Sequence, residues 1–306
     1  GRDYDGVDNN AYTNVMAVWV LLRALDARML LDSERRIELD ERLGLGADEV
    51  AGWDEISRKM FVPFHDGVIS QFEGYERLEE FDWEDYRAKY GDIHRLDRLL
   101  EAEGDTVNRY KASKQADALM LFYLFSAEEL GDLFARLGYP FEGELIPRTV
   151  DYYLRRTSNG STLSGIVHSW VLARSDRAGS WTQLGAALES DIADVQGGTT
   201  PEGIHLGAMA GTVDLVQRGQ TGLEIRDDML RLNPCLPEEL RGLRFRIRHR
   251  GHWLDIDIGC ERLTISAPDG WDGPERIVIR DRLSGEQHAI AFDEEAYSLG
   301  IQEGHE

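Results

Sequence analysis

The chain has 306 residues, and it contains little cysteine and no long apolar run. Cys235 and Cys260 are its two cysteines, too few for a disulfide framework and without metal-ligand spacing. We therefore expect a cytoplasmic location and neither a zinc nor an iron–sulfur site. We expect no other cofactor either. No apolar segment approaches the roughly 18–20 residues that span a membrane, so we expect neither a transmembrane helix nor a signal peptide.

Basic residues are also scarce. Lysine and arginine total 34 against 57 aspartates and glutamates, which gives a net charge of −23. Nucleic acids and anionic membranes attract basic surfaces, so this balance argues against either as a partner. The composition of 42% hydrophobic and 30% charged residues is typical of a folded globular protein.

From Ala11 to Arg218 the apolar residues recur at helical spacing, and no convincing alternating segment appears. The pattern predicts helices near 11–25, 33–43, 47–60, 84–90, 114–125, 126–137, 161–174, 180–190 and 201–217. The fold class predicted is mainly helical, with residues 1–232 forming the helical part.

Three sequence signals mark expected helix starts. Ser126 to Glu129 has the pattern of a capping box, as does the segment from Ser180 to Gln183. Thr200 precedes Pro201, and proline is favoured at the first position of a helix. We therefore expect helices to begin at these three places.

After residue 233 the pattern changes to alternation. Apolar and charged residues alternate over 243–248 and 254–258, and shorter apolar repeats follow at 263–265 and 277–279. We expect four or five short antiparallel strands that form a small β domain over 233–306. Arginines along the first strand could bind phosphate, but cross-strand pairing with Asp255 and Asp257 is the favoured interpretation.

Two loops of small polar residues precede expected helices. Residues 157–164 read TSNGSTLS, and residues 196–200 read QGGTT ahead of the helix expected to carry His205 one turn from its start. Free N–H groups and the helix dipole make such starts suitable for anions. Ordinary helix capping is the alternative for each loop taken singly.

Three further positions have two interpretations each. His205 could donate to an anion at the helix start, or be a partly buried histidine bound to a carbonyl. His168, beside apolar residues, is expected in the core. Lys114 and Gln115 open an apolar helix and could bind sugar hydroxyls, although a lysine is also common at a helix start. With 57 acidic residues, spacing alone selects no general acid.

Five segments in order resemble glycoside hydrolase family 65, which includes maltose, trehalose and kojibiose phosphorylases. The matching segments run over residues 7–14, 71–75, 107–117, 157–164 and 194–207. The resemblance extends over essentially the whole chain and covers the C-terminal part of such an enzyme. It implies the C-terminal half of an (α/α)6 barrel followed by a small antiparallel β-sheet domain.

The resemblance also implies a reaction. An α-linked glucose disaccharide and inorganic phosphate would give β-glucose 1-phosphate with inversion. Lys114 and Gln115 would bind the glucosyl unit, while Ser161, Thr162 and His205 would bind phosphate. Asn159 stands where many relatives have histidine.

At its start the chain departs from the family pattern. The family's general acid is a glutamate shortly before the first matching segment, and here Arg2 falls near that position, with Asp3 as the nearest carboxylate. Arginine does not donate a proton at neutral pH. We therefore expect the chain alone to be catalytically impaired, and to form a homodimer or associate with an N-terminal portion.

Two other functions remain open at this stage. One is hydrolysis of an α-glucoside, as in trehalases, with a carboxylate such as Glu202 activating water. The other is a non-catalytic carbohydrate-binding or assembly module.

Overall fold

The structure is a computed structural model of the whole chain. It describes residues 6–114, 116–173, 175–193, 201, 203–226, 229–234, 236–260 and 262–267, and the backbone of 277–280, 287–290 and 296–300. The chain divides into two compact units, Gly1–Val167 and His168–Glu306. Each unit is described by itself.

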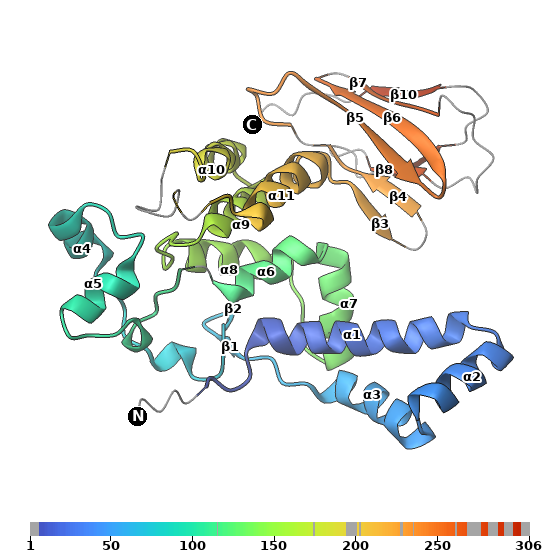
Figure 1. Cartoon of the computed structure of the whole chain (residues 1–306), viewed down its shortest axis with the longest axis horizontal. Coiled ribbons are helices and arrows are strands. Elements are labelled where there is room, and N and C mark those ends of the chain that lie inside the picture. The colour runs from blue at the N-terminus through green and yellow to red at the C-terminus, as the bar shows by residue number, and fades with distance from the viewer. Residues whose placement is uncertain are drawn as a thin grey trace. The chain divides into compact units, whose positions relative to one another are not determined.

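The first unit is helical (Figure 1). Its helices are α1 (Ala11–Leu30), α2 (Ser33–Leu43), α3 (Ala47–Lys59), α4 (Trp83–Tyr90), α5 (Leu96–Ala102), α6 (Asp117–Leu124), α7 (Ala127–Leu137) and α8 (Leu145–Leu154). Helix α9 (Thr162–Leu172) crosses the division between the units. The second unit continues with α10 (Arg177–Glu189), α11 (Leu206–Asp214) and a π-helical turn, Leu215–Gly219.

Most of the predicted helices are present, with ends shifted by a few residues. Two helices were not predicted, α5 and α8. The predicted helix at 201–217 begins only at Leu206, so the start expected at Pro201 is wrong. The start at Ser126 is confirmed, because its hydroxyl accepts the N–H of Glu129 at 3.2 Å.

The helix start expected at Ser180 is wrong. Asp176 caps α10 instead, and its carboxylate accepts the N–H of Gly179 at 2.9 Å. Ser180 lies inside the helix and is 1% exposed. Its hydroxyl donates to the carbonyl of Ser169 at 2.7 Å, which satisfies a buried polar group.

Apolar side chains at helical spacing form the core of the first unit. In α7, Leu130, Leu133, Phe134 and Leu137 are buried on one face. Phe134 is fully buried, and its ring lies 5.8 Å from that of Phe64 between centroids. The amphipathic pattern therefore predicted which face of α7 packs inward.

A short β-hairpin interrupts the helices, contrary to the expectation that no strand precedes Arg218. Strand β1 (Phe64–His65) pairs antiparallel with β2 (Val68–Ile69). Asp66 and Gly67 connect them with φ of 47° and 74°, as the tight two-residue hairpin turn requires. Two-residue strands are too short to show an alternating pattern.

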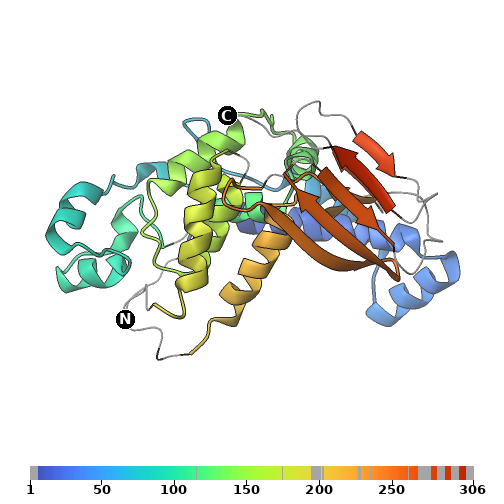
Figure 2. The same ribbon diagram turned by 90° about the horizontal axis from the view of Figure 1, so that it is seen from above.

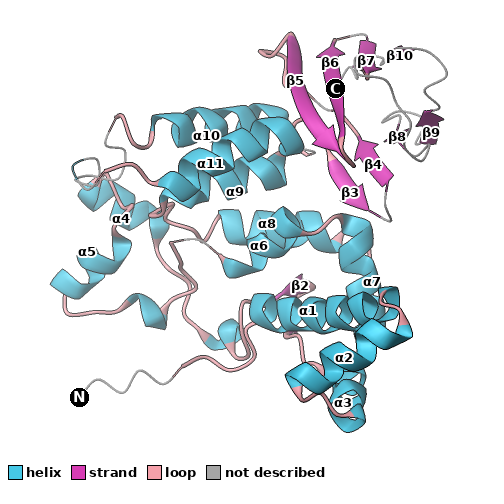
Figure 3. Cartoon of the chain, turned by 45° about the vertical axis from the view of Figure 1, so that its right-hand side comes forward, coloured by secondary structure: helices cyan, strands magenta, loops and turns pink. Residues whose placement is uncertain are grey.

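The C-terminal strands form two four-stranded sheets, coloured magenta in Figure 3 and orange to red in Figure 2. One sheet has the order β10-β7-β6-β5 and is antiparallel, and the other has the order β3-β4-β8-β9 with β4 and β8 parallel. The strands are β3 (Glu224–Arg226), β4 (Met229–Leu232), β5 (Gly242–His249), β6 (His252–Gly259), β7 (Arg262–Ser266), β8 (Ile277–Arg280), β9 (Gln287–Ile290) and β10 (Ala296–Gly300).

The strands thus begin at Glu224, earlier than the predicted β domain from 233, and their number exceeds the four or five expected. One apolar core joins the two sheets. It contains Leu230 and Leu232 of β4, Leu254, Ile256 and Ile258 of β6, Leu263 and Ile265 of β7, and Ala267. The mainly helical chain with C-terminal sheets is the fold class that the sequence predicts. Among the described helices, none combines the length and the apolar character needed to cross a bilayer.

Candidate functional site

The segment with Lys114 lies beside the loop that precedes α9. Ser113 and Thr157 form a parallel bridge. The N–H of Ser113 donates to the carbonyl of Arg156 at 3.1 Å, and the N–H of Ser158 donates to the carbonyl of Ser113 at 2.9 Å. These bonds join the proposed sugar-binding and phosphate-binding segments, although the two bridged residues are 44 positions apart in the sequence.

A third segment, ending at the start of α5, closes against the same loop. The hydroxyl of Ser158 donates to the carbonyl of His94 at 3.5 Å. Gly160 lies so close that a Cβ there would stand 2.2 Å from the His94 carbonyl oxygen. Asn159 adopts a φ of 57°, in the left-handed region that asparagine tolerates better than most residues. The loop is therefore held tightly at its centre.

Lys114 binds a carboxylate in this structure. Its Nζ lies 3.1 Å from Oδ2 of Asp97, and its side chain is 46% exposed. Burial of Asp97 opposes ionisation, but the hydrogen bond and charge of Lys114, together with those of Arg95, outweigh burial and lower the pKa of Asp97. Lys114 also anchors α9, because its carbonyl accepts the hydroxyl of Ser164 at 3.1 Å.

Ser161 and Thr162 stand at the start of α9, as the sequence predicts. The hydroxyl of Ser161 accepts the N–H of Leu163 at 3.3 Å, which is the geometry of an N-cap. Both residues remain partly exposed. The capping interpretation is thus realised, and the Ser161 hydroxyl keeps its own proton for donation to a ligand.

His205 lies at the cap position of α11, directly before its first residue, and not one turn into a helix as expected. Its Nδ1 lies 2.6 Å from Oδ1 of Asp191, and its backbone N–H donates to Oδ2 of the same carboxylate at 2.9 Å. The pKa of Asp191 is lowered, and the hydrogen bond from the His205 side chain is the largest cause. Asp191 was not predicted from the sequence; it lies 14 positions before His205.

Residues 7–14 and 71–75, two of the segments that resemble family 65, are joined by hydrogen bonds to the start of α6. The N–H of Ala11 donates to the carbonyl of Gln71 at 2.9 Å, and the side-chain oxygen of Gln71 accepts the N–H of Asp117 at 3.0 Å. Asn10 closes the group, since its side-chain amide donates to Asp117 at 3.1 Å. Segments 7–14, 71–75 and 107–117 therefore meet in the first unit.

Several predicted positions lie outside the described residues: Asp3, Gln115, Glu202 and the loop 196–200. Ser161 and Thr162 belong to the first unit and His205 to the second. Their joint action on one phosphate stays a prediction.

His168 is a core residue, as expected. It is 1% exposed, and burial lowers its pKa to about 4. Its ring is therefore neutral at physiological pH. A buried, neutral ring does not bind anions from solvent as a cation.

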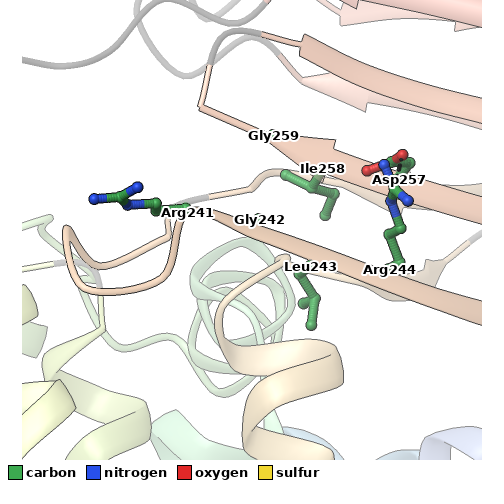
Figure 4. A pocket seen from close by; sticks show the side chains of 7 residues that line it. All are labelled: Arg241, Gly242, Leu243, Arg244, Asp257, Ile258 and Gly259. Atoms are coloured by element: carbon green, nitrogen blue, oxygen red, sulfur yellow. Dashed lines mark ion pairs between the residues drawn. The ribbon is translucent and has the colours of Figure 1, made fainter.

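Two arginines of β5 form the cross-strand pairs with aspartates that the favoured interpretation expects. Arg244 and Arg246 stand opposite Asp257 and Asp255, and the Arg244 Nε lies 2.7 Å from Asp257. A surface hollow of about 490 Å³ lies over the start of β5 and the end of β6 (Figure 4). In that view Arg241 extends away from the Arg244–Asp257 pair. The hollow contains none of the predicted site residues.

The described part of the chain was expected to hold no metal ion. There, no three side chains of histidine, cysteine, aspartate or glutamate are grouped so that they could hold a metal ion. The expected absence of a cofactor stays a prediction.

Comparison with known families assigns the class of protein. Residues 3–214 match the glycosyl hydrolase family 65 central catalytic domain, and residues 223–284 match the C-terminal domain of the same family. The chain belongs to glycosyl hydrolase family 65, as its motifs suggested.

Individual relatives are phosphorylases or glycosyl hydrolases by name. An uncharacterized glycosyl hydrolase of Mycobacterium tuberculosis is 59% identical over 92% of this chain and 21% of its own length. Trehalose 6-phosphate phosphorylase of Lactococcus lactis is 36% identical over 86% of this chain and 33% of its own length. Kojibiose phosphorylase of Caldanaerobacter subterraneus is 28% identical, over 94% and 35% respectively.

A solved structure of a human-microbiome protein shares the fold. It matches 98% of this chain and 40% of its own chain with a TM-score of 0.72 and 21% sequence identity. The chain thus spans between about a fifth and two fifths of the length of these relatives.

Proposed function

We propose that this chain is the phosphate-binding and sugar-binding part of an inverting disaccharide phosphorylase. The substrates are an α-linked glucose disaccharide and inorganic phosphate. A carboxylic acid protonates the glycosidic oxygen while a phosphate oxygen attacks the anomeric carbon from the opposite side. The bond to the leaving sugar breaks, and β-glucose 1-phosphate forms.

Phosphate itself is the nucleophile, so this reaction needs no second carboxylate to activate water. We assign sugar binding to Lys114 and Gln115. We assign phosphate binding to Ser161, Thr162 and His205. Asp3 is the nearest candidate for the acid in sequence. Because the chain spans only about a third of the length of its phosphorylase relatives, we expect the chain alone to turn over slowly.

The observation that carries this proposal is the junction of two loops in the first unit. The Ser113–Thr157 bridge and the bond from Ser164 to the Lys114 carbonyl hold a lysine beside a serine-rich helix start. A cation and hydroxyl groups together suit a sugar next to an anion. The names of four relatives favour phosphorolysis, since each of these proteins is called a phosphorylase.

The names of the relatives indicate which disaccharides to test. Trehalose 6-phosphate phosphorylase is more similar to the chain than the kojibiose and trehalose phosphorylases are. Trehalose 6-phosphate therefore belongs in any test together with trehalose, kojibiose and maltose.

The test is turnover by the purified chain with each disaccharide, with and without inorganic phosphate. We expect little β-glucose 1-phosphate from the chain alone and no phosphate-independent glucose. Rapid release of β-glucose 1-phosphate would contradict the expected impairment but support the reaction. Phosphate-independent glucose release would overturn phosphorolysis in favour of hydrolysis.

We further propose a cytoplasmic location and association with a second copy or with an N-terminal portion of the enzyme. The scarcity of cysteine supports the cytoplasmic location. The small share of the relatives' length that the chain covers supports the association. Size-exclusion chromatography of the chain tests the association.

A further inference from the structure

We propose that Asp191 positions the imidazole of His205 so that Nε2 is the ring atom presented to phosphate. This inference rests on the proposed function, because it assigns a positioning residue to the phosphate site. Asp191 acts through His205 and has no assigned contact with the substrate itself.

One carboxylate holds His205 at two points. Oδ1 of Asp191 lies 2.6 Å from Nδ1 of the ring, and Oδ2 accepts the backbone N–H of the same residue at 2.9 Å. A bond to the ring and a bond to the backbone together restrict how the side chain can turn. The ring is therefore oriented before any ligand arrives.

The chemistry of the pair fixes the ring protons. An ionised carboxylate only accepts hydrogen bonds, so Nδ1 must carry a proton. The lowered pKa of Asp191, due first to the His205 hydrogen bond, keeps that carboxylate ionised at neutral pH. Nε2 consequently lacks a proton in the neutral ring and has one in the charged ring.

Exposure separates the roles of the two residues. The side chain of Asp191 is 6% exposed, whereas that of His205 is 33% exposed. The acid thus lies beneath the ring, and the ring remains accessible. From that position Nε2 can donate to a phosphate oxygen when charged, or accept from a phosphate hydroxyl when neutral.

If Asp191 had a purely structural role, that role would consist of its bond to the backbone N–H of His205, which holds the start of α11. Asp176 offers the matched case, because it caps α10 through the N–H of Gly179 at 2.9 Å. A capping role predicts the same consequences for both substitutions. A positioning role predicts that only Asp191 affects phosphate.

The first measurement needs no substitution at Asp191. Long-range proton–nitrogen NMR of the labelled full chain at pH 8 reports the tautomer of His205, assigned by the loss of its signals in His205→Gln. We expect the Nδ1–H form. The Nε2–H form in the wild-type chain would overturn the inference.

The second measurement is titration calorimetry with inorganic phosphate. We expect Asp191→Asn to weaken phosphate binding about tenfold and to shift the tautomer toward Nε2–H, because the asparagine amide can donate to Nδ1. Asp191→Glu restores part of the affinity, and Asp176→Asn leaves it unchanged. Unchanged phosphate affinity in a folded Asp191→Asn chain would contradict the inference.

The two measurements separate this inference from the proposed function. A wild-type chain that binds no phosphate would contradict the proposed function. The tautomer would then still test the inferred orientation of the His205 ring. The Nδ1–H form would support that orientation, and the Nε2–H form would contradict it.

Discussion

Two serines cap helices of the first unit through similar bonds. Ser126 accepts the N–H of Glu129 at 3.2 Å, and Ser161 accepts the N–H of Leu163 at 3.3 Å. Of these two serines, only Ser161 is assigned a role in phosphate binding. The pair therefore separates capping from ligand binding.

Replacing either serine by alanine removes a helix cap. We expect Ser126→Ala and Ser161→Ala each to lower the free energy of unfolding by about 0.5–2 kcal/mol. Urea unfolding measures that cost. In calorimetry, only Ser161→Ala weakens the binding of inorganic phosphate; an equal loss in both variants would assign the effect to stability.

Of the two proposed sugar-binding residues, Lys114 is the one whose position the structure describes. We expect Lys114→Met to weaken the best-bound disaccharide about tenfold or more, because a hydrogen bond from a charged group contributes about 1.5–3 kcal/mol. Lys59→Met is the control, since Lys59 is paired with Glu55 on the exposed side of α3. Unchanged sugar affinity in Lys114→Met would show that Lys114 does not bind the sugar and forms only its ion pair with Asp97.

At the scale of single residues, the sequence could name groups whose surroundings are local. Ser161 was predictable because a polar residue directly precedes an apolar helix. Asp191 was not, because its bond to His205 joins residues 14 positions apart, and no periodicity indicates such a bond. The φ of 57° at Asn159 likewise follows from the tight packing of its loop.

Among the elements, the loop before α9 depends on one close approach. Gly160→Ala would place a Cβ 2.2 Å from the His94 carbonyl oxygen, and backbone cannot move aside easily. We expect a loss of about 1–3 kcal/mol in stability and weaker binding of both phosphate and disaccharide.

Gly52→Ala is the matched control for this substitution. No atom lies within 4 Å of a Cβ at Gly52, which is inside α3. Alanine is the better helix former by about 0.5–1 kcal/mol, so the control should be slightly more stable and bind ligands normally. Normal ligand binding by folded Gly160→Ala would show that the loop geometry is not needed.

Glu103 stabilises the junction of α4 and α5 in a pH-dependent way. Hydrogen bonds from Lys89, Tyr86 and Tyr90 lower its pKa from 4.5 to about 2. A lowered pKa in the folded state gives stability that is complete above about pH 5 and is lost as the pH falls toward 2.

We expect Glu103→Gln to be less stable than the wild-type chain at pH 7, with the difference shrinking between pH 5 and pH 2. Tyr86→Phe removes one of the three bonds and should show a smaller change of the same sign. Urea unfolding at several pH values measures both. A difference that does not depend on pH would contradict this assignment.

Element prediction succeeded where periodicity was long and failed where it was short or punctuated. Helix α7 shows a full apolar stripe between Ser126 and the left-handed Gly138. Helix α5 has only seven residues, and α8 contains Pro147 in its first turn, a residue that usually signals a break. Ser180 resembled a cap, but Asp176 lies one turn earlier and caps better.

For the molecule as a whole, the change from helical to alternating patterns predicted the order of helices and sheets. The sequence could not predict the division at Val167, because it falls within the continuous helix α9. It also could not predict the second sheet, whose parallel pair joins β4 to the distant β8. Such pairings depend on tertiary packing and leave no local pattern.

The acidic composition does not conflict with an anionic co-substrate. The net charge of −23 acts over the whole surface, whereas phosphate would be captured by a helix start, hydroxyl groups and one histidine. Local donors can bind an anion because they act at hydrogen-bond distance, while salt screens charges beyond roughly 8–10 Å.

The most direct test of the central claim is titration of inorganic phosphate into the purified chain, with chloride at the same ionic strength as the control. We expect saturable binding of one phosphate per chain, abolished or strongly weakened in His205→Gln. No saturable binding by the folded wild-type chain at millimolar phosphate would contradict the claim that this chain carries the phosphate site of a family 65 phosphorylase.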